Sequence, residues 1–497
     1  TSGVILTVEK VEVENVTISE TIPVDWLPKP KITGFEDGQT SLTYTETATA
    51  IPAQLKFTGS LAIQDVEFSF NFQDPQEKFQ ALNGKTFLLS QLSEEDRALF
   101  NAASIILPSL DGTNGGQFDF TAMTSSLQTL AGGADATNTI NLRVKANDRW
   151  SSEKLSSYQI ITTKPIFHVS AYPGNIWTKE FTMNSLLEEE VESGDYTKLS
   201  EGMTYQFSTN GNDWTNFGDD LRKANLTPGT TYYIRGVYRG EIASTATEIM
   251  TYPIIELENG GVENSTITTG ADGKIGQDRG ARYAWPGWAT TNPLTTPNCH
   301  AAAYAHNSRS GVRPTTDKPS SSLGSNAIRI ITMGYGYGST YNNINSFIHS
   351  ELFLGTEPEE DNDNRTYGIP YASHPSGLGF YYKCISNVGN DVSEALVELY
   401  HDDIILGNGV FQTGAKDNYE YQQIHIDYLK EQEILKLEPN KIVIRFKSGT
   451  KNNLSQSDLK KMFGSNNFIT GNTDTTADCM WRGNELFIDD ISLIYDK

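Results

Sequence analysis

Hydrophobic and polar residues alternate with a period of two along much of the chain. Because successive side chains of a strand point to opposite faces, this alternation predicts half-buried antiparallel strands. Repeated Asn-Gly and Asp-Gly pairs between such runs supply tight turns. The clearest runs lie at residues 66–72, 140–144, 203–207, 424–428 and 442–446. The sequence therefore predicts an all-β protein.

Only two stretches favour helices, and both are short. Ser93 suits an N-cap, because Glu94, Glu95 and Asp96 follow it in the first turn, where the helix dipole favours negative charge. A second helix is predicted from about Thr121 to Leu130, where a pair of glycines follows and ends it. The helices are thus minor additions to a chain of strands.

Two prolines mark the expected boundaries between domains. Pro165 and Pro253 each follow a strand-like run and precede a new one, and the residue before a proline favours extended backbone. These boundaries predict three segments, 1–165, 166–253 and 254–497. Further prolines between residues 23 and 30 predict that residues 1–25 form a separate strand pair.

The two N-terminal segments resemble known β-sandwich modules. Residues 226–235 have the sequence Leu-Thr-Pro-Gly-Thr-Thr-Tyr-Tyr-Ile-Arg, which resembles the tyrosine-corner strand of fibronectin type III domains. The pattern around residues 44–46, 118–121 and 146–152 is similar to immunoglobulin-like modules of surface lipoproteins from glycan-degrading gut bacteria. The expected architecture is two such sandwiches in tandem, followed by a third domain.

Composition narrows the set of partners. The 497 residues contain 38 Lys and Arg against 62 Asp and Glu, a formal net charge of −24. A negative surface repels phosphate backbones and anionic lipid, so neither nucleic acid nor a membrane surface is an expected partner. No apolar run approaches the ~20 residues of a membrane-spanning helix, and no signal peptide is visible. Three cysteines without a Cys-x-x-Cys motif predict no disulfide framework.

The third segment carries most of the functional signal. It opens with Asn259-Gly-Gly-Val-Glu263 and closes with Ile488-Asp-Asp-Ile-Ser-Leu493, which resemble the two edges of jelly-roll carbohydrate-binding modules. With the motifs between them, at 285–292, 326–332, 351–355 and 368–383, the segment resembles the putative carbohydrate metabolism domain family. This resemblance implies a jelly-roll sandwich and a glycan-related role at the bacterial cell surface, either secreted or anchored to the outer membrane. Val262 and Cys384 depart from the pattern of that family.

Aromatic side chains are the candidate glycan contacts, because the C–H faces of sugars stack on aromatic rings. Trp285 and Trp288 lie three residues apart in a Pro-Gly turn. Tyr335 and Tyr337 alternate with glycines, which allow close approach to the backbone. His374 is expected to line the same face as Tyr371. The alternative is that these rings fill the core.

The resemblance also implies a structural calcium ion that joins the first and last strands of the jelly roll. Carboxylate and carbonyl oxygens suit this hard cation. Glu258 or Glu263 in the opening segment and Asp489 or Asp490 in the closing segment are the expected ligands. The alternative is that one aspartate caps a turn and the other faces water.

Three functions stay open from the sequence. The first is a glycan-binding protein whose N-terminal domains act as spacers. The second is a glycoside hydrolase, which needs only two carboxylates ~5–10 Å apart; Glu351 with Asp361 or Asp363 is the candidate pair. The third is a structural adhesin that binds other surface proteins, favoured by an unpaired edge strand in the first segment.

Overall fold

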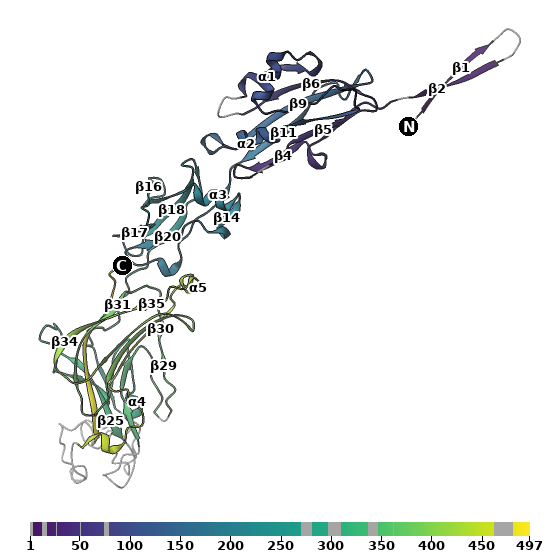
Figure 1. Ribbon diagram of the computed structural model, residues 1–497. Helices are drawn as coiled ribbons and strands as arrows, with labels where there is room; N and C mark the ends of the chain where they lie inside the picture. The colour runs from purple at the N-terminus through teal and green to yellow at the C-terminus, as the bar shows by residue number, and fades with distance from the viewer. Residues whose placement is uncertain are drawn as a thin grey trace.

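The computed structural model describes residues 3–11, 17–25, 27–49, 51–73, 79–269, 281–296, 310–335, 346–360, 362–461 and 481–497. The protein is nearly all strand, and its domains follow one another in an extended row (Figure 1). The three largest hydrophobic cores of the described residues span residues 35–160, 167–249 and 262–491. The predicted all-β class is therefore correct. None of the helices in these ranges is long and apolar enough to cross a membrane.

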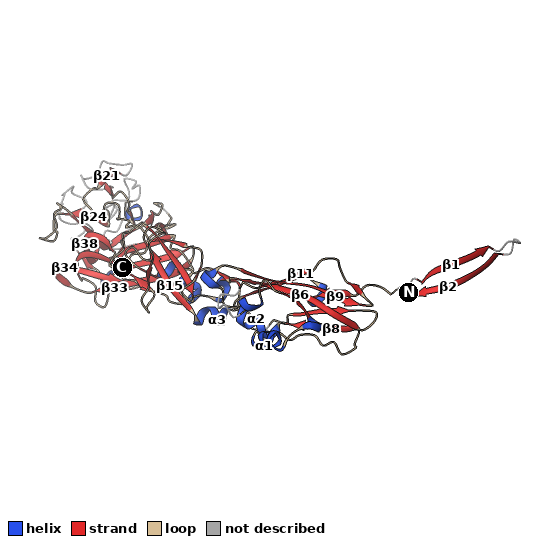
Figure 2. Cartoon of the chain, turned by 90° about the horizontal axis from the view of Figure 1, so that it is seen from above, coloured by secondary structure: helices blue, strands red, loops and turns tan. Residues whose placement is uncertain are grey.

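A two-stranded ribbon precedes the first core. Strand β1 (Gly3–Val11) pairs antiparallel with β2 (Thr17–Asp25), from Gly3 opposite Asp25 to Val11 opposite Thr17. Within the described residues neither strand joins another sheet. Figure 2 shows the ribbon standing apart from the first sandwich. The separate strand pair expected in residues 1–25 is thus present.

The first sandwich has a larger and a smaller sheet around a phenylalanine-rich core. The larger sheet has the order β4 (Ser41–Thr45), β11 (Ser156–Thr163), β9 (Ala136–Ala146), β6 (Ile63–Asn71), β7 (Thr86–Leu88), with β10 (Arg149–Trp150) beside β9. The smaller sheet is β3 (Lys31–Gly34), β5 (Gln54–Thr58), β8 (Gly115–Asp119). Short 3₁₀ helices are η1 (Glu36–Gly38), η2 (Gln80–Leu82), η3 (Leu89–Gln91) and η4 (Ala131–Gly133).

Both predicted helices lie in this sandwich. Helix α1 (Glu94–Ala102) begins at Ser93, whose Oγ accepts the Asp96 N–H at 3.0 Å, while the Asp96 carboxylate accepts the Ser93 N–H. This is a capping box, a reciprocal arrangement that satisfies two helix-start donors. Helix α2 (Thr121–Leu127) ends earlier than the predicted Leu130.

The second sandwich is smaller and is built from short strands. Its elements are β12 (Ile166–Phe167), η5 (Pro173–Asn175), β13 (Phe181–Thr182), η6 (Glu188–Glu190), β14 (Val191–Ser193), α3 (Tyr196–Glu201), β15 (Met203–Ser208), β16 (Thr215–Asn216), β17 (Arg222–Lys223), β18 (Thr231–Tyr238), β19 (Ile242–Ala243) and β20 (Thr247–Met250). At the start of β18, the Tyr232 hydroxyl accepts the Thr227 N–H at 2.9 Å. This bond back to nearby backbone is the contact expected from the tyrosine-corner motif.

The third domain packs two large sheets face to face. The first sheet, with the order β23 (Ala289–Thr290), β27 (Glu351–Phe353), β36 (Lys441–Lys447), β32 (Ser393–His401), β33 (Ile404–Thr413), β35 (Asp427–Tyr428), also carries β30 (Ile369–Pro370). The second sheet, here called the closing-strand sheet, has the order β24 (Val312–Thr315), β25 (Ala327–Tyr335), β38 (Trp481–Ile494), β31 (Gly377–Ile385), β34 (Lys416–His425), with β26 (Ser346–His349) and β37 (Lys460–Lys461). Smaller elements are β21 (Thr266–Thr269), β22 (Ala281–Ala284), α4 (Asn292–Thr295), β28 (Gly355–Thr356), β29 (Thr366–Tyr367), α5 (Gln432–Leu435) and η7 (Gln456–Asp458).

The joint between the first and second sandwiches is held by polar contacts. The buried Glu46 carboxylate pairs with the Arg239 guanidinium at 2.5 Å and accepts the Leu130 N–H at 3.2 Å. The Asp195 N–H donates to Thr47 Oγ1 at 2.7 Å. The Glu46–Arg239 pair and the Asp195–Thr47 bond cross between the two cores, so the first joint is a packed interface.

The joint between the second and third domains is aromatic. The imidazole of His374 stacks on the indole of Trp177, with ring centroids 3.9 Å apart and planes inclined by 4°. Its Nδ1–H donates to the Ile176 carbonyl oxygen at 2.6 Å. Lys179 Nζ donates to the Tyr495 carbonyl oxygen at 2.5 Å. The two domains are thus joined through these side-chain contacts as well as through the connecting chain at 253–256, where Ile254 is 45% exposed.

Candidate functional site

The two tryptophans predicted as a glycan platform lie in the core of the third domain. Trp285 is 3% exposed and Trp288 is 6% exposed. Their indole N–H groups donate to the carbonyl oxygens of Val262 and Glu258, at 3.2 and 3.1 Å. The opening segment therefore covers both rings and satisfies their only polar atoms. The prediction that Trp285 and Trp288 are exposed to a glycan is wrong, because both rings fill the core of the third domain.

The other predicted glycan contacts are not displayed to solvent either. Tyr371 is buried, and its hydroxyl lies 2.5 Å from that of Tyr495. His374 is buried at the second joint. Neither can meet a sugar, so the expectation of a glycan-facing Tyr371 and His374 is wrong. Tyr337 lies outside the described residues, and Tyr335 is described only as the last residue of β25.

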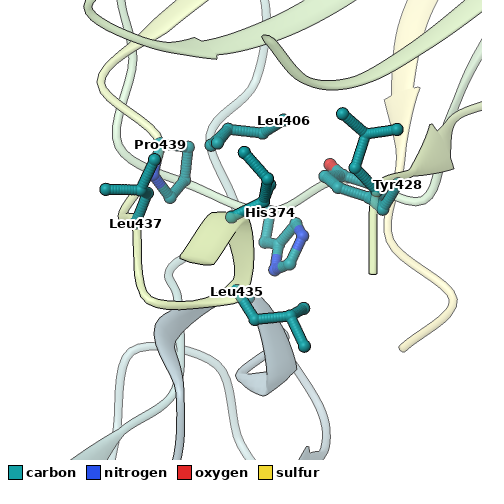
Figure 3. A pocket seen from close by; sticks show the side chains of 9 residues that line it. His374, Leu406, Tyr428, Leu435, Leu437 and Pro439 are labelled. Carbon is teal, nitrogen blue, oxygen red and sulfur yellow. The ribbon is translucent and has the colours of Figure 1, made fainter. Parts of the chain in front are cut away.

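A small cavity beside His374 belongs to this joint. Figure 3 shows the imidazole among apolar side chains of the third domain, and the lining includes Gly174 of the second. The ring of Tyr428 meets that of His374 edge-on at 4.3 Å. Burial lowers the pKa of His374 to about 4, so the ring is neutral at neutral pH. These contacts make His374 a residue that holds two domains together.

The candidate carboxylates of a hydrolase are joined through one arginine. Glu351 is 3% exposed and accepts the Tyr367 hydroxyl at 2.6 Å. Arg365 lies 3.1 Å from the Glu351 carboxylate and 2.6 Å from that of Asp363, and Lys447 approaches Glu351 at 3.6 Å. Glu351 is therefore part of a buried ion-pair network and does not face Asp363 across an open cleft. Asp361 lies outside the described residues.

Of the four expected metal ligands, Asp489 and Asp490 lie on the closing strand β38, and the charge of Glu263 reaches Asp489 from the opening segment, residues 256–264. The Gly260 carbonyl oxygen accepts the Ile491 N–H at 2.8 Å, which ties the opening segment to β38. Asp489 is fully buried there, and Asp490 and Glu263 lie near enough for their charges to act on it. Glu258 instead is exposed and lies against Gly287.

The Asp489 carboxylate has an unusual environment. Burial, with the charges of Asp490 and Glu263, raises its pKa to about 6, against hydrogen bonds from Ser322 and the Asp490 N–H that favour the charged form. Its Oδ2 is buried and has no hydrogen-bond partner among the described residues. A buried carboxylate oxygen without a partner is costly.

The carboxylates around Asp489 match calcium by chemistry, although within the described residues they are not arranged as a metal site. Asp489, Asp490 and Glu263 offer carboxylate oxygens, which this hard cation prefers, and backbone carbonyls complete many such sites. A bound cation would supply the partner that Asp489 Oδ2 lacks. The described part of the chain contains no group of three or more His, Cys, Asp or Glu side chains already spaced to hold a metal. Carbonyl oxygens or water would therefore have to contribute.

An aromatic surface that the sequence analysis missed lies on the outward face of the closing-strand sheet. Tyr381 of β31 and Tyr421 of β34 are opposite each other in the ladder. Their ring centroids are 5.1 Å apart and their planes are inclined by 59°. Tyr421 is 46% exposed. We call this pair the tyrosine platform.

Glycines beneath the platform explain its shape. A Cβ at Gly379 would lie 2.2 Å from the Tyr421 hydroxyl oxygen and 3.0 Å from its ring carbon Cζ. The missing side chain therefore lets the Tyr421 ring lie across the sheet, with its other face turned to solvent. Gly377 occupies the same face two residues earlier, where Ile494 lies beside both glycines. The only sequence signal was the alternation Gly-x-Gly-x-Tyr at 377–381.

Polar residues border the platform. Gly379 is opposite Gln423 on one side and Ser492 on the other, and both are exposed. Tyr381 is opposite Asp489, next to an irregularity in the pairing of β31 with β38. The tyrosine platform and the Asp489 carboxylate are thus neighbours in one sheet.

Comparisons with known proteins add resemblances but no family. No protein-family model matches the chain, and no curated protein matches it. Among solved structures it is similar to TmCBM61 in complex with β-1,4-galactotriose, with 13% identity and a TM-score of 0.18 over 37% of this chain and 83% of that one. It is also similar to the family 11 carbohydrate-binding module of cellulase Lic26A-Cel5E of Clostridium thermocellum, with 10% identity and a TM-score of 0.18 over 47% and 95%.

A third similar structure is an enzyme. It is a cyclase from Fischerella sp. TAU, with 14% identity and a TM-score of 0.22 over 48% of this chain and 94% of that one. At such identities and TM-scores these similarities assign the chain to none of these families.

Proposed function

We propose that the third domain binds carbohydrate on the tyrosine platform. The observation that carries the proposal is the half-exposed Tyr421 ring lying across the sheet over Gly379. Leaving a large ring in water forgoes about 1.5–3 kcal/mol of burial free energy. A sugar that stacks its C–H face on the ring would recover part of it.

The border of the platform suits the hydroxyl groups of a sugar. Gln423 offers an amide that both donates and accepts, and Ser492 offers a hydroxyl. Both belong to the outward face that carries Tyr381 and Tyr421. An apolar centre with a few polar groups at its edge is the usual make-up of small-molecule sites.

We propose further that calcium binds at Asp489, with Asp490 and Glu263. The ion would neutralise the buried carboxylate and fix the opening segment to the closing strand. Because Asp489 is opposite Tyr381, a fixed strand at this point would hold the ring in place. The role of the metal in this proposal is structural.

The remaining parts of the proposal concern the whole chain. We propose that it is a non-catalytic glycan-binding protein at the bacterial cell surface, related to the putative carbohydrate metabolism domain family. The domains 1–165 and 166–253 would hold the third domain, 254–497, away from the cell. The contacts at both joints support a spacer role, because they limit bending between domains.

The test is a glycan array with the full chain in the presence of calcium. We expect the wild type to be retained by a subset of glycans, and Tyr421→Ala to lose that retention without a change in melting temperature. Tyr196→Ala, which truncates a tyrosine that is 36% exposed on α3, is the matched control and should bind as the wild type does. Retention that is unchanged in Tyr421→Ala, or absent in the wild type, would refute the proposal.

A further inference from the structure

The inclination of the two rings restricts which glycans the tyrosine platform can take. Tyr381 and Tyr421 are adjacent, but their planes differ by 59°. A polymer whose successive sugars lie in one plane can stack on only one of them, because the second ring would meet the next sugar at a steep angle. A chain that bends between successive sugars can place one sugar on each ring.

The charges on this face restrict the ligand further. Three cations of the closing-strand sheet are already engaged in ion pairs: Lys383 with Asp317, Lys416 with Glu420, and Arg329 with Glu485 at 2.5 Å. The residues that border the platform, Gln423 and Ser492, carry no charge, and the whole chain has a net charge of −24. A carboxylated or sulfated glycan would therefore be repelled here, where paired cations offer it little compensation.

We propose that the tyrosine platform is selective for neutral glycans whose linkages turn successive sugars out of one plane. This inference rests on the proposed carbohydrate-binding function and adds the class of ligand. Tyr421 stacks on one sugar, and the inclined Tyr381 contacts the next. Flat, ribbon-like chains make only the first contact, and anionic chains are disfavoured by charge.

The experiment compares three classes of soluble oligosaccharide by titration calorimetry with the full chain and calcium. The flat class is represented by cello-oligosaccharides, the bent neutral class by β-1,3-glucan and α-1,4-glucan oligosaccharides and β-1,4-galactan oligosaccharides, and the anionic class by oligogalacturonates. We expect the tightest binding within the bent neutral class, by about fivefold or more over the flat class, as the loss of one ring contact implies.

The Tyr381→Ala variant tests the cause of the selectivity. With the inclined ring removed, we expect the advantage of the bent neutral class over the flat class to shrink toward equality, while Tyr421→Ala removes binding of both. Circular dichroism and melting temperature verify that each variant is folded.

The possible outcomes distinguish failure of the proposed selectivity from failure of the proposed carbohydrate binding. Tightest binding to cello-oligosaccharides or to oligogalacturonates, dependent on Tyr421, would overturn the selectivity and leave carbohydrate binding standing. A bent-chain preference that is unchanged in Tyr381→Ala would also overturn it. Absence of binding to all three classes and to the glycan array would overturn the proposed function itself.

Discussion

The buried His374 makes the joint between the second and third domains sensitive to acid. Its pKa is lowered to about 4 by burial, whereas the same side chain in an unfolded chain titrates near its usual value of 6.5. Between these values the unfolded chain takes up a proton that the folded chain does not. The stability that the neutral ring provides above pH 6.5 is therefore lost as the pH falls toward 4.

The size of this effect follows from the difference in pKa. A shift from 6.5 to about 4 corresponds to about 3 kcal/mol in full, and to about 2 kcal/mol between pH 7 and pH 5. The variant His374→Phe keeps a ring to stack on Trp177 but has no titrating group. It also loses the N–H donor to the Ile176 carbonyl oxygen, which costs about 1–3 kcal/mol at every pH.

The assay is urea unfolding of wild type and His374→Phe at pH 7, 6 and 5, followed by tryptophan fluorescence. We expect the variant to be less stable at pH 7, and the difference in free energy of unfolding to shrink by about 2 kcal/mol at pH 5. His425→Phe, which alters a side chain that is 68% exposed, is the control. A difference that stays constant from pH 7 to pH 5 would refute the reasoning.

The calcium concentration must be held constant in this assay, because the pKa of Asp489, a proposed calcium ligand, is shifted in the opposite direction to that of His374. The pKa of Asp489 is raised to about 6 in the folded chain, from a usual value of 3.8. The folded chain therefore gains stability on protonation of Asp489 as the pH falls through 6, which offsets part of the loss at His374. Comparing variant and wild type at each pH removes this contribution, since both carry Asp489.

Three other expectations follow from burial and pairing. Trp288→Ala should lower the free energy of unfolding of the third domain by about 3–5 kcal/mol, as large core truncations do; a loss below about 1 kcal/mol in urea unfolding would contradict its burial. A chelator should lower the melting temperature of the wild type but not that of Asp489→Asn. An equal decrease in both proteins would show that Asp489 does not bind the metal. Glu46→Ala should destabilise the first joint by up to about 3 kcal/mol, because the Arg239 guanidinium loses its closest ion-pair partner and keeps only the more distant Glu241. It should also broaden the distance distribution in small-angle scattering; an unchanged distribution would mean that the pair does not hold the joint.

The fold was largely predictable because strand periodicity is a local property. The alternating runs at 140–144 and 203–207 lie inside β9 and β15, and the run at 66–72 lies inside β6 except for its last residue. The run at 424–428 instead spans the end of β34 and all of β35. The N-cap at Ser93 was equally local, since both of its hydrogen-bond partners lie within three residues.

The candidate site was not predictable in the same way, because exposure of an aromatic ring depends on distant residues. Trp288 is covered by a carbonyl oxygen thirty residues away in sequence. Tyr421 lies open because the strand beneath it offers Gly379, and no short window contains both. The aromatic pairs nearest in sequence were therefore chosen as platforms, and the pair formed across two strands was overlooked. The strand-addition hypothesis for the first segment stays a prediction, with the β1–β2 ribbon as its candidate.

The residues wrongly expected to face a glycan bear on glycan binding indirectly. The hydroxyl groups of Tyr371 and Tyr495 form a hydrogen bond next to the joint between the second and third domains, and His374 stacks on Trp177 across this joint. The third domain therefore cannot turn against the second without unstacking a buried ring and breaking several hydrogen bonds. Ligand binding costs free energy whenever it restricts motion between domains, and domains whose joint is already ordered lose less conformational entropy on binding. A fixed joint would thus let the free energy of stacking on the tyrosine platform appear as affinity.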